Sequence, residues 1–84
     1  RDGTVVSSPD AIDPRLWDAL RARRRELATE QNVPPYVIFH DTTLEEIARR
    51  KPRDLDAFLE IPGIGERKLA RYGDDFLEVL ERFA

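Results

Sequence analysis

The chain has 84 residues, of which 40% are hydrophobic and 37% charged, with a formal net charge of -3. This length fits one domain with a small core. It contains no cysteine, which excludes disulfides, thiol catalysis and thiolate zinc sites. No apolar run is long enough to span a membrane and no signal peptide is recognisable, so we expect a soluble cytoplasmic protein. Methionine is absent as well, which suggests a segment of a longer polypeptide.

The charge is unevenly distributed along the chain. Residues 1–40 hold six cations and six anions, whereas residues 41–84 hold eight cations and eleven anions. Strong binding to duplex nucleic acid normally requires several cations on one face of a basic domain. Any contact with nucleic acid is therefore expected to be weak, local and salt-sensitive.

The first twelve residues differ in composition from the rest. Residues 1–12 are mostly small and polar and are predicted to be a linker or flexible arm. Asp13 followed by Pro14 is typical of an N-cap and a first helical position. The folded domain is therefore predicted to cover residues 13–84.

The first helix is expected to pack against a core. Leu16, Leu20 and Leu27 lie on one stripe at helical spacing, and the helix is predicted to end near Gln31. Arg23 falls inside this stripe. Its position leaves two interpretations open, a side chain that snorkels to solvent or an altered exposed face.

The other arginines of this helix lie elsewhere on its circumference. At 100° per residue, Arg21 and Arg25 point away from the leucine stripe and are available for phosphate contacts. Arg24 lies at the margin of the stripe. It is expected to pack its stem and pair with a carboxylate on the buried side.

A short apolar turn follows the first helix. Pro34 and Pro35 precede "YVIF", which is too short and too close to the prolines for a central strand. Val37, Ile38 and Phe39 are predicted to fill the core.

A second helix is predicted after this turn. Residues 41–43, Asp-Thr-Thr, have the composition of an N-cap, and Glu45 and Glu46 stand at capping-box spacing from the two threonines. Pro52 is expected to end the helix.

Three shorter helices are predicted in the second half. Asp54 begins one, Gly63 and Gly65 turn the chain into another, and Gly73 is expected to break that helix before a last one. No stretch alternates as a strand does. The sequence therefore predicts an all-α fold, a compact bundle of about five short helices.

The turn "IPGIGERK" matches the helix-hairpin-helix pattern, in which backbone amides read phosphates. Gly63 permits a conformation closed to other residues, and Gly65 leaves room beside the N–H groups that open the next helix. Three cations follow within two turns, Arg67, Lys68 and Arg71. The alternative is that the turn only packs two helices closely, and Glu66 beside the amides favours that alternative.

Three segments together resemble an HRDC domain, the helicase-and-RNase-D C-terminal domain. They are "LWDALRARRRELA", "VPPYVIFHDTTLEEIA" and "IPGIGERKLARYG", and the resemblance covers about residues 14–82. "VPPYVIF" is most similar to RecQ helicases. The resemblance implies a non-catalytic accessory domain of an ATP-dependent DNA helicase, located with the nucleoid. Such a domain weakly binds single-stranded or branched DNA, contacts other domains of its helicase, and tunes DNA-structure selectivity and ATPase activity without cofactor or small-molecule ligand.

The resemblance also implies a basic patch near the Pro-Pro-Tyr turn. An outward ring at Tyr36 would form a stacking platform for a base; the alternative is a core tyrosine with only its hydroxyl exposed. The implied DNA-binding set consists of Arg21, Arg25, Tyr36, Gly63, Gly65, Arg67, Lys68 and Arg71.

Acidic residues in the second half support a different function. They are either a solvated face or a regulatory face that repels DNA or docks onto the parent helicase or another protein. That face consists of Asp54, Asp56, Glu60, Asp74, Asp75 and Glu78.

No catalytic or metal site is predicted. His40 is the only histidine and has no partner at metal-ligand spacing, and the aspartates lie at helix starts, where carboxylates are common. There is no Walker loop, nucleophile elbow or acid/base pair. The domain by itself is therefore not expected to be an enzyme.

Overall fold

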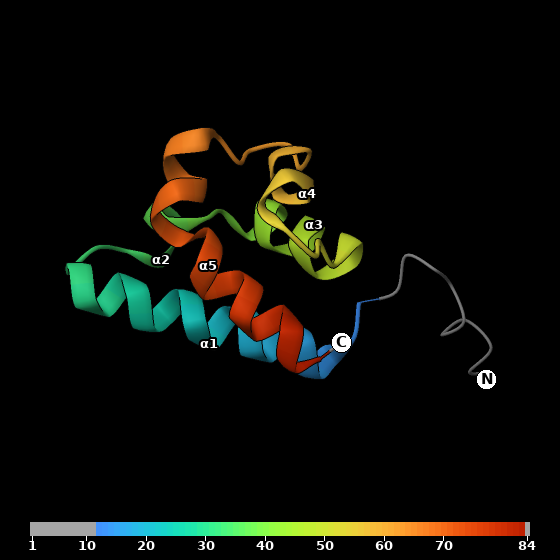
Figure 1. Ribbon diagram of the computed structural model, residues 1–84. Helices are drawn as coiled ribbons and strands as arrows, with labels where there is room; N and C mark the ends of the chain where they lie inside the picture. Colours follow the sequence, from blue (N-terminus) through green and yellow to red (C-terminus); the bar gives the residue numbers. More distant parts are fainter. Residues whose placement is uncertain (1–11, 84) are drawn as a thin grey trace.

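The computed structural model describes residues 12–83, which form five helices and no strand (Figure 1). The helices are α1 (Pro14–Gln31), α2 (Pro35–Ile38), α3 (Asp41–Arg50), α4 (Leu55–Leu59) and α5 (Glu66–Arg82). The predicted all-α bundle is confirmed. The predicted linker lies outside the described residues except for Ile12, which is half-buried and packs against the core.

The two long helices, α1 and α5, form the frame of the bundle. They pack against each other, and the end of α5 lies beside the start of α1 (Figure 1). α1 also packs against α2 and α3, whereas α4 packs against α5. The short helix α2 lies near the end of α1 and the start of α5, away from the start of α1 and the end of α5 (Figure 1).

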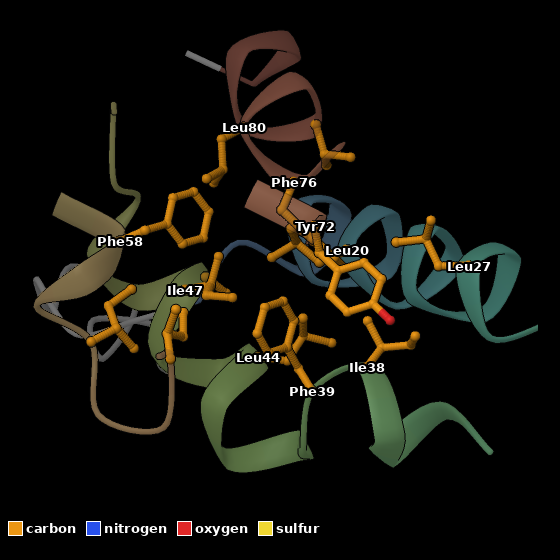
Figure 2. Close-up of a cluster of buried hydrophobic side chains, with 14 of the residues drawn as sticks. Leu20, Leu27, Ile38, Phe39, Leu44, Ile47, Phe58, Tyr72, Phe76 and Leu80 are labelled. Carbon is orange, nitrogen blue, oxygen red and sulfur yellow. The ribbon is translucent and has the colours of Figure 1, made fainter. Parts of the chain in front are cut away.

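Aromatic rings fill the space between the helices. Figure 2 shows that Phe39, Ile47 and Phe76 project into one cluster from the segment after α2, from α3 and from α5. The rings of Phe39 and Phe76 meet edge to face, with centroids 5.2 Å apart. Such pairs add about 0.5–1.5 kcal/mol to the burial of their area.

The start and end of α1 agree with the sequence. Asp13 Oδ1 accepts a 2.9 Å hydrogen bond from the N–H of Arg15, and Pro14 is the first helical residue. Asn32 closes the helix in the left-handed conformation, and its N–H donates to the Thr29 carbonyl. Each end thus satisfies backbone groups that a helix leaves unpaired.

The predicted capping box of α3 is wrong. The helix begins already at Asp41, His40 occupies the N-cap position, and no side chain there bonds the backbone. Glu46 instead accepts hydrogen bonds from Arg49 and Arg50. The earlier start places Thr43 inside the helix, where it is buried beneath the glycine turn.

The predicted break at Gly73 is also wrong, because α5 runs through it without interruption. A Cβ at this position would lie 2.8 Å from Leu55 Cδ2 and 2.9 Å from Leu69 Cδ1. Gly73 is buried and lets α4 approach α5 closely. The glycine therefore serves helix packing and not chain reversal.

The short turn predicted at "YVIF" is a four-residue helix, α2, which runs from Pro35 to Ile38 and is followed by Phe39. Ile38 and Phe39 are buried as predicted, but Val37 is 38% exposed, so its predicted core position is wrong. In a helix of four residues only one side faces the core, and Tyr36 and Val37 both lie on the outer sides.

Candidate nucleic-acid interface

The helix α2 holds Tyr36 in a fixed outward position. Pro34 is extended and Pro35 is the first helical residue, so the two rings restrict the backbone on which Tyr36 stands. The Tyr36 side chain is 58% exposed. The alternative of a core tyrosine is thereby excluded, and an aromatic face is presented to solvent.

One side of α2 borders an open hollow of about 480 Å³, which we name the aromatic hollow. Its nearly parallel rings are those of Tyr36 and His40, with centroids 5.9 Å apart and an interplanar angle of 20°. The complete lining is Arg24, Pro35, Tyr36, His40, Asp41 and Thr42. His40 was not predicted to take part, although its spacing of four residues from Tyr36 was visible in the sequence.

One residue that lines the aromatic hollow is a buried arginine. Arg24 is only 9% exposed; its Nη1 donates to the Phe39 carbonyl at 2.9 Å and contacts Asp41 Oδ1 at 2.8 Å. Arg24 pairs with a carboxylate as predicted, but this carboxylate is exposed and does not lie on the buried side. This contact joins α1 to the start of α3 in the lining of the hollow that Tyr36 shares.

The other side of α2 borders a second hollow of about 400 Å³, which we name the basic groove. It is lined by the three cations that follow the glycine turn and by the end of α1. The complete lining is Gln31, Val33, Val37, Arg67, Lys68, Arg71 and Tyr72. The hydroxyl of Tyr72 is 2.8 Å from Gln31 Oε1 and donates to it, which fixes the wall between α5 and α1.

Lys68 connects the basic groove directly to α2. Its Nζ donates to the Val37 carbonyl at 2.9 Å and lies 5.8 Å from the centroid of the Phe39 ring. Arg67 and Arg71 are exposed, and the Arg71 guanidinium lies 5.6 Å from the centroid of the Tyr72 ring. Lys68 is thus both a cation of the groove and a structural contact, whereas Arg67 extends into solvent.

The two turn glycines have different physical roles. Gly63 has φ +93°, and a Cβ there would lie 2.5 Å from Thr43 Oγ1. Both the backbone conformation and the contact with α3 require glycine at this position. Gly65 has an ordinary φ of -96° and open space around its missing Cβ.

Packing therefore explains Gly63 and leaves Gly65 unexplained. Gly65 is the N-cap of α5 and has no side chain that could cap the helix. No capping side chain therefore accepts a hydrogen bond from the first N–H groups of α5. Glu66 is exposed in the first turn. The turn is a packing device at Gly63 and an accessible helix start at Gly65.

Arg21 and Arg25 line neither hollow. Both are exposed, one turn apart, on the flank of α1 that continues from Arg24 away from the core. The Arg21 guanidinium lies 5.8 Å from the centroid of the Trp17 ring. Neither cation lines the groove that gathers the cations of α5.

Arg23 is explained by contacts with acidic side chains. Its guanidinium pairs with Glu26 at 2.8 Å and with Asp75 on α5, and the hydrogen bonds that it donates to Glu26 and Asp75 raise the pKa of Arg23 above its usual value. The side chain is half-buried and joins α1 to α5 at its charged end. Asp75 is consequently engaged within the domain.

The predicted acidic face is divided between structural and exposed carboxylates. Asp54 caps α4, where its Oδ1 accepts a 2.8 Å hydrogen bond from the N–H of Ala57. The remaining members, apart from the half-buried Asp75, are exposed: Asp56, Glu60, Asp74 and Glu78.

The outer side of α5 changes sign along its length. Arg67 and Arg71 share this side with Asp74 and Glu78, because steps of three and four residues keep side chains on one face. The basic end borders α2, and the acidic end runs toward the chain terminus. The same helix therefore offers a cationic surface for about two turns and an anionic surface beyond it.

Neither a metal-binding cluster nor a membrane-spanning helix occurs among the described residues. Within residues 12–83, no three His, Asp or Glu side chains lie close enough to hold a metal ion. None of the five helices has the length and apolar character needed to cross a bilayer.

Similarity to known proteins agrees with this geometry. The family described as "HRDC domain" matches residues 13–80. The ATP-dependent DNA helicase RecQ of Bacillus subtilis is 45% identical over 69 residues, which cover 82% of this chain and 12% of the helicase. The ATP-dependent DNA helicase UvrD2 of Mycobacterium tuberculosis is 48% identical over 69 residues, or 82% of this chain and 10% of that helicase.

A solved structure shares the fold as well. The structure titled "D. radiodurans RecQ HRDC domain 3" superimposes with a TM-score of 0.78 at 40% identity and covers 81% of this chain and 90% of its own. The chain spans only about a tenth of the length of the two helicases that it matches. The resemblance inferred from the three sequence segments is confirmed, and the chain belongs to the HRDC domain family.

Proposed function

We propose that this chain is a non-catalytic accessory domain of an ATP-dependent DNA helicase and that it binds single-stranded or partly single-stranded DNA weakly. The observation that carries the proposal is the outward ring of Tyr36, 58% exposed on a proline-fixed helix that borders three cations. Aromatic rings bind bases of any sequence, and cations beside them hold the backbone. The relatives named as ATP-dependent DNA helicases support the assignment to such a parent, which would act at the nucleoid.

The charge of the described residues accounts for weak binding. The basic groove supplies three cations, Arg67, Lys68 and Arg71, and one of them also holds α2. Each neutralised phosphate of a single strand contributes a slope of about 0.7 to the dependence of log K on log salt. The affinity should therefore fall steeply as salt rises and become small at physiological ionic strength.

The role in the parent helicase would be to select DNA structures. The exposed carboxylates Asp74 and Glu78 lie on the side of α5 that carries the cations, so a strand is guided toward α2 and away from the later turns. Deleting the domain from the helicase should leave DNA-dependent ATP hydrolysis present. Its level, and the preference between branched and simple substrates, should change.

A second function is favoured by the exposed carboxylates. Asp56, Glu60, Asp74 and Glu78 form no ion pair within residues 12–83. Such a surface fits a regulatory module that contacts a basic region of the parent helicase or another protein. In that case the domain would bind little DNA of its own.

Fluorescence anisotropy separates the two functions. The domain is titrated into labelled single-stranded, duplex and forked oligonucleotides at low salt and again at raised salt. Binding of the single-stranded and forked DNA in preference to the duplex, with loss at raised salt, is the result that the DNA-binding proposal predicts. No binding to any of the three at low salt would overturn it and favour the protein-interaction module.

A further inference from the structure

The aromatic hollow differs in charge from the basic groove on the other side of α2. Its cation, Arg24, is paired with its anion, Asp41, at 2.8 Å. No net positive charge therefore remains to hold a phosphate, whereas the basic groove has three cations and no carboxylate in its lining. The aromatic hollow suits an uncharged group that stacks on rings and donates hydrogen bonds.

The Asp41 carboxylate is held in place and still accessible. Arg24 is nine-tenths buried, and its guanidinium is anchored on the Phe39 carbonyl. Its contact with Asp41 Oδ1 therefore fixes the orientation of the carboxylate. The Asp41 side chain is nevertheless 72% exposed. An ionised carboxylate only accepts hydrogen bonds and has about four lone-pair sites, so one contact leaves acceptors directed to solvent.

The walls of the aromatic hollow suit a planar group. The Tyr36 and His40 rings are inclined by only 20°, and Pro35 and Thr42 complete the lining. A volume of about 480 Å³ lies within the range of small-ligand sites, roughly 300–1,000 Å³. A base stacked on the rings could turn its edge toward Asp41, which lines the same hollow.

We propose that the aromatic hollow binds one nucleobase of single-stranded DNA and that Asp41 reads its edge, with a preference for guanine. The inference rests on the proposed DNA binding and adds a base preference to it. The Watson–Crick edge of guanine carries two adjacent donors, N1–H and the 2-amino group, which match the two oxygens of a carboxylate. Cytosine and adenine offer one amino donor beside an acceptor nitrogen, and thymine offers N3–H between two carbonyl oxygens. Unpaired bases are commonly read on this edge.

The test compares single-base replacements in one strand. Anisotropy is measured for an oligothymidine with a central thymine, cytosine, guanine or hypoxanthine, at one low salt concentration. Hypoxanthine keeps N1–H and lacks only the 2-amino group. The guanine strand should bind about five- to tenfold more tightly than the thymine strand, at the low end for a paired contact to a base edge, with hypoxanthine between them.

A pair of variants assigns the preference to Asp41. Asp41→Asn keeps an oxygen for Arg24 but places a donor opposite the guanine donors, so the preference for guanine should be lost. Asp74→Asn removes the same charge outside the hollow and should leave the preference intact. Thermal unfolding of both variants establishes that they are folded.

The possible outcomes test the base preference, the role of Asp41 and the proposed DNA binding separately. Equal affinity of the unmodified domain for all four strands would overturn the base reading and leave the DNA-binding proposal standing. A guanine preference that survives in folded Asp41→Asn would overturn the role of Asp41. Absence of binding to every strand would overturn the proposed function and this inference with it.

Discussion

Lys68 and Val37, which are 31 positions apart in the sequence, are joined by a 2.9 Å hydrogen bond from the ammonium to the carbonyl. The contact fixes the first turns of α5 against α2, the helix that carries Tyr36. A cation of the proposed DNA surface is thereby also a support for the aromatic ring beside it. Removing Lys68 should therefore lower both stability and DNA affinity, whereas removing a neighbouring arginine should not lower both.

Lys68→Ala should lower both stability and DNA affinity. We expect the free energy of unfolding to fall by about 0.5–1.5 kcal/mol through the lost hydrogen bond, and the salt slope of binding to fall by about 0.7. Arg67→Ala is the matched control, because Arg67 is exposed and outside this contact. It should lower the slope by the same amount while changing stability by less than about 0.5 kcal/mol. Denaturant unfolding and salt-dependent anisotropy check both values; unchanged binding in both variants would show that the basic groove holds no phosphate.

Tyr36→Ala should weaken binding to single strands without unfolding the domain. The loss expected for one stacked base is about 1–3 kcal/mol, and the exposed position predicts an unchanged helical circular dichroism spectrum. Tyr36→Phe keeps the ring and should retain most of the affinity. Loss of binding in the phenylalanine variant as well would mean that the hydroxyl, and not stacking, makes the contact.

The two turn glycines should respond in opposite ways. Gly63→Ala places a Cβ against Thr43 at positive φ, so we expect a loss of about 1–3 kcal/mol in unfolding free energy. Gly65→Asp adds a favourable N-cap residue in open space and should leave stability equal or higher. The added charge at the start of α5 should nevertheless weaken DNA binding if a phosphate approaches these amides. Unchanged affinity in Gly65→Asp would restrict the turn to packing.

Neutralising the acidic end of α5 should strengthen DNA binding. The double variant Asp74→Asn with Glu78→Gln removes two exposed carboxylates and should raise the affinity at low salt by a few-fold, an advantage that disappears as screening increases. The regulatory alternative predicts a different result, in which DNA affinity does not change and binding to the parent helicase is reduced. Anisotropy with DNA and calorimetric titration against the remainder of the helicase distinguish the two.

Much of the fold could be predicted because its signals are local. The Asp13–Pro14 start of α1 and the leucine stripe depend on residues within one helix, and both are observed. Gly73 was misinterpreted because its role depends on Leu55 of α4, a contact that no local pattern reveals. The ambiguity at Arg23 had the same origin, since its partner Asp75 lies 52 positions away.

The candidate site was predictable to a similar extent. Tyr36 and the cations after the glycine turn were predicted from their residue types and from the resemblance. In the structure Tyr36 stands on α2 and lines the aromatic hollow, and the cations line the basic groove. Arg21 and Arg25 were grouped with them, but they lie apart on the flank of α1. The participation of His40 and Asp41 in a hollow depends on how α2 meets α3, which sequence spacing alone does not determine.

The most direct test of the central claim is a titration of the ¹⁵N-labelled domain with a short single-stranded oligonucleotide at low salt, followed by amide chemical shifts. If DNA lies across α2, shift changes should concentrate on Tyr36 and Val37 of α2, on Gly65, and on the first two turns of α5. They should fade as salt is added. Changes confined to α4 and the acidic end of α5, or no changes at any DNA concentration, would contradict the claim that DNA lies across α2.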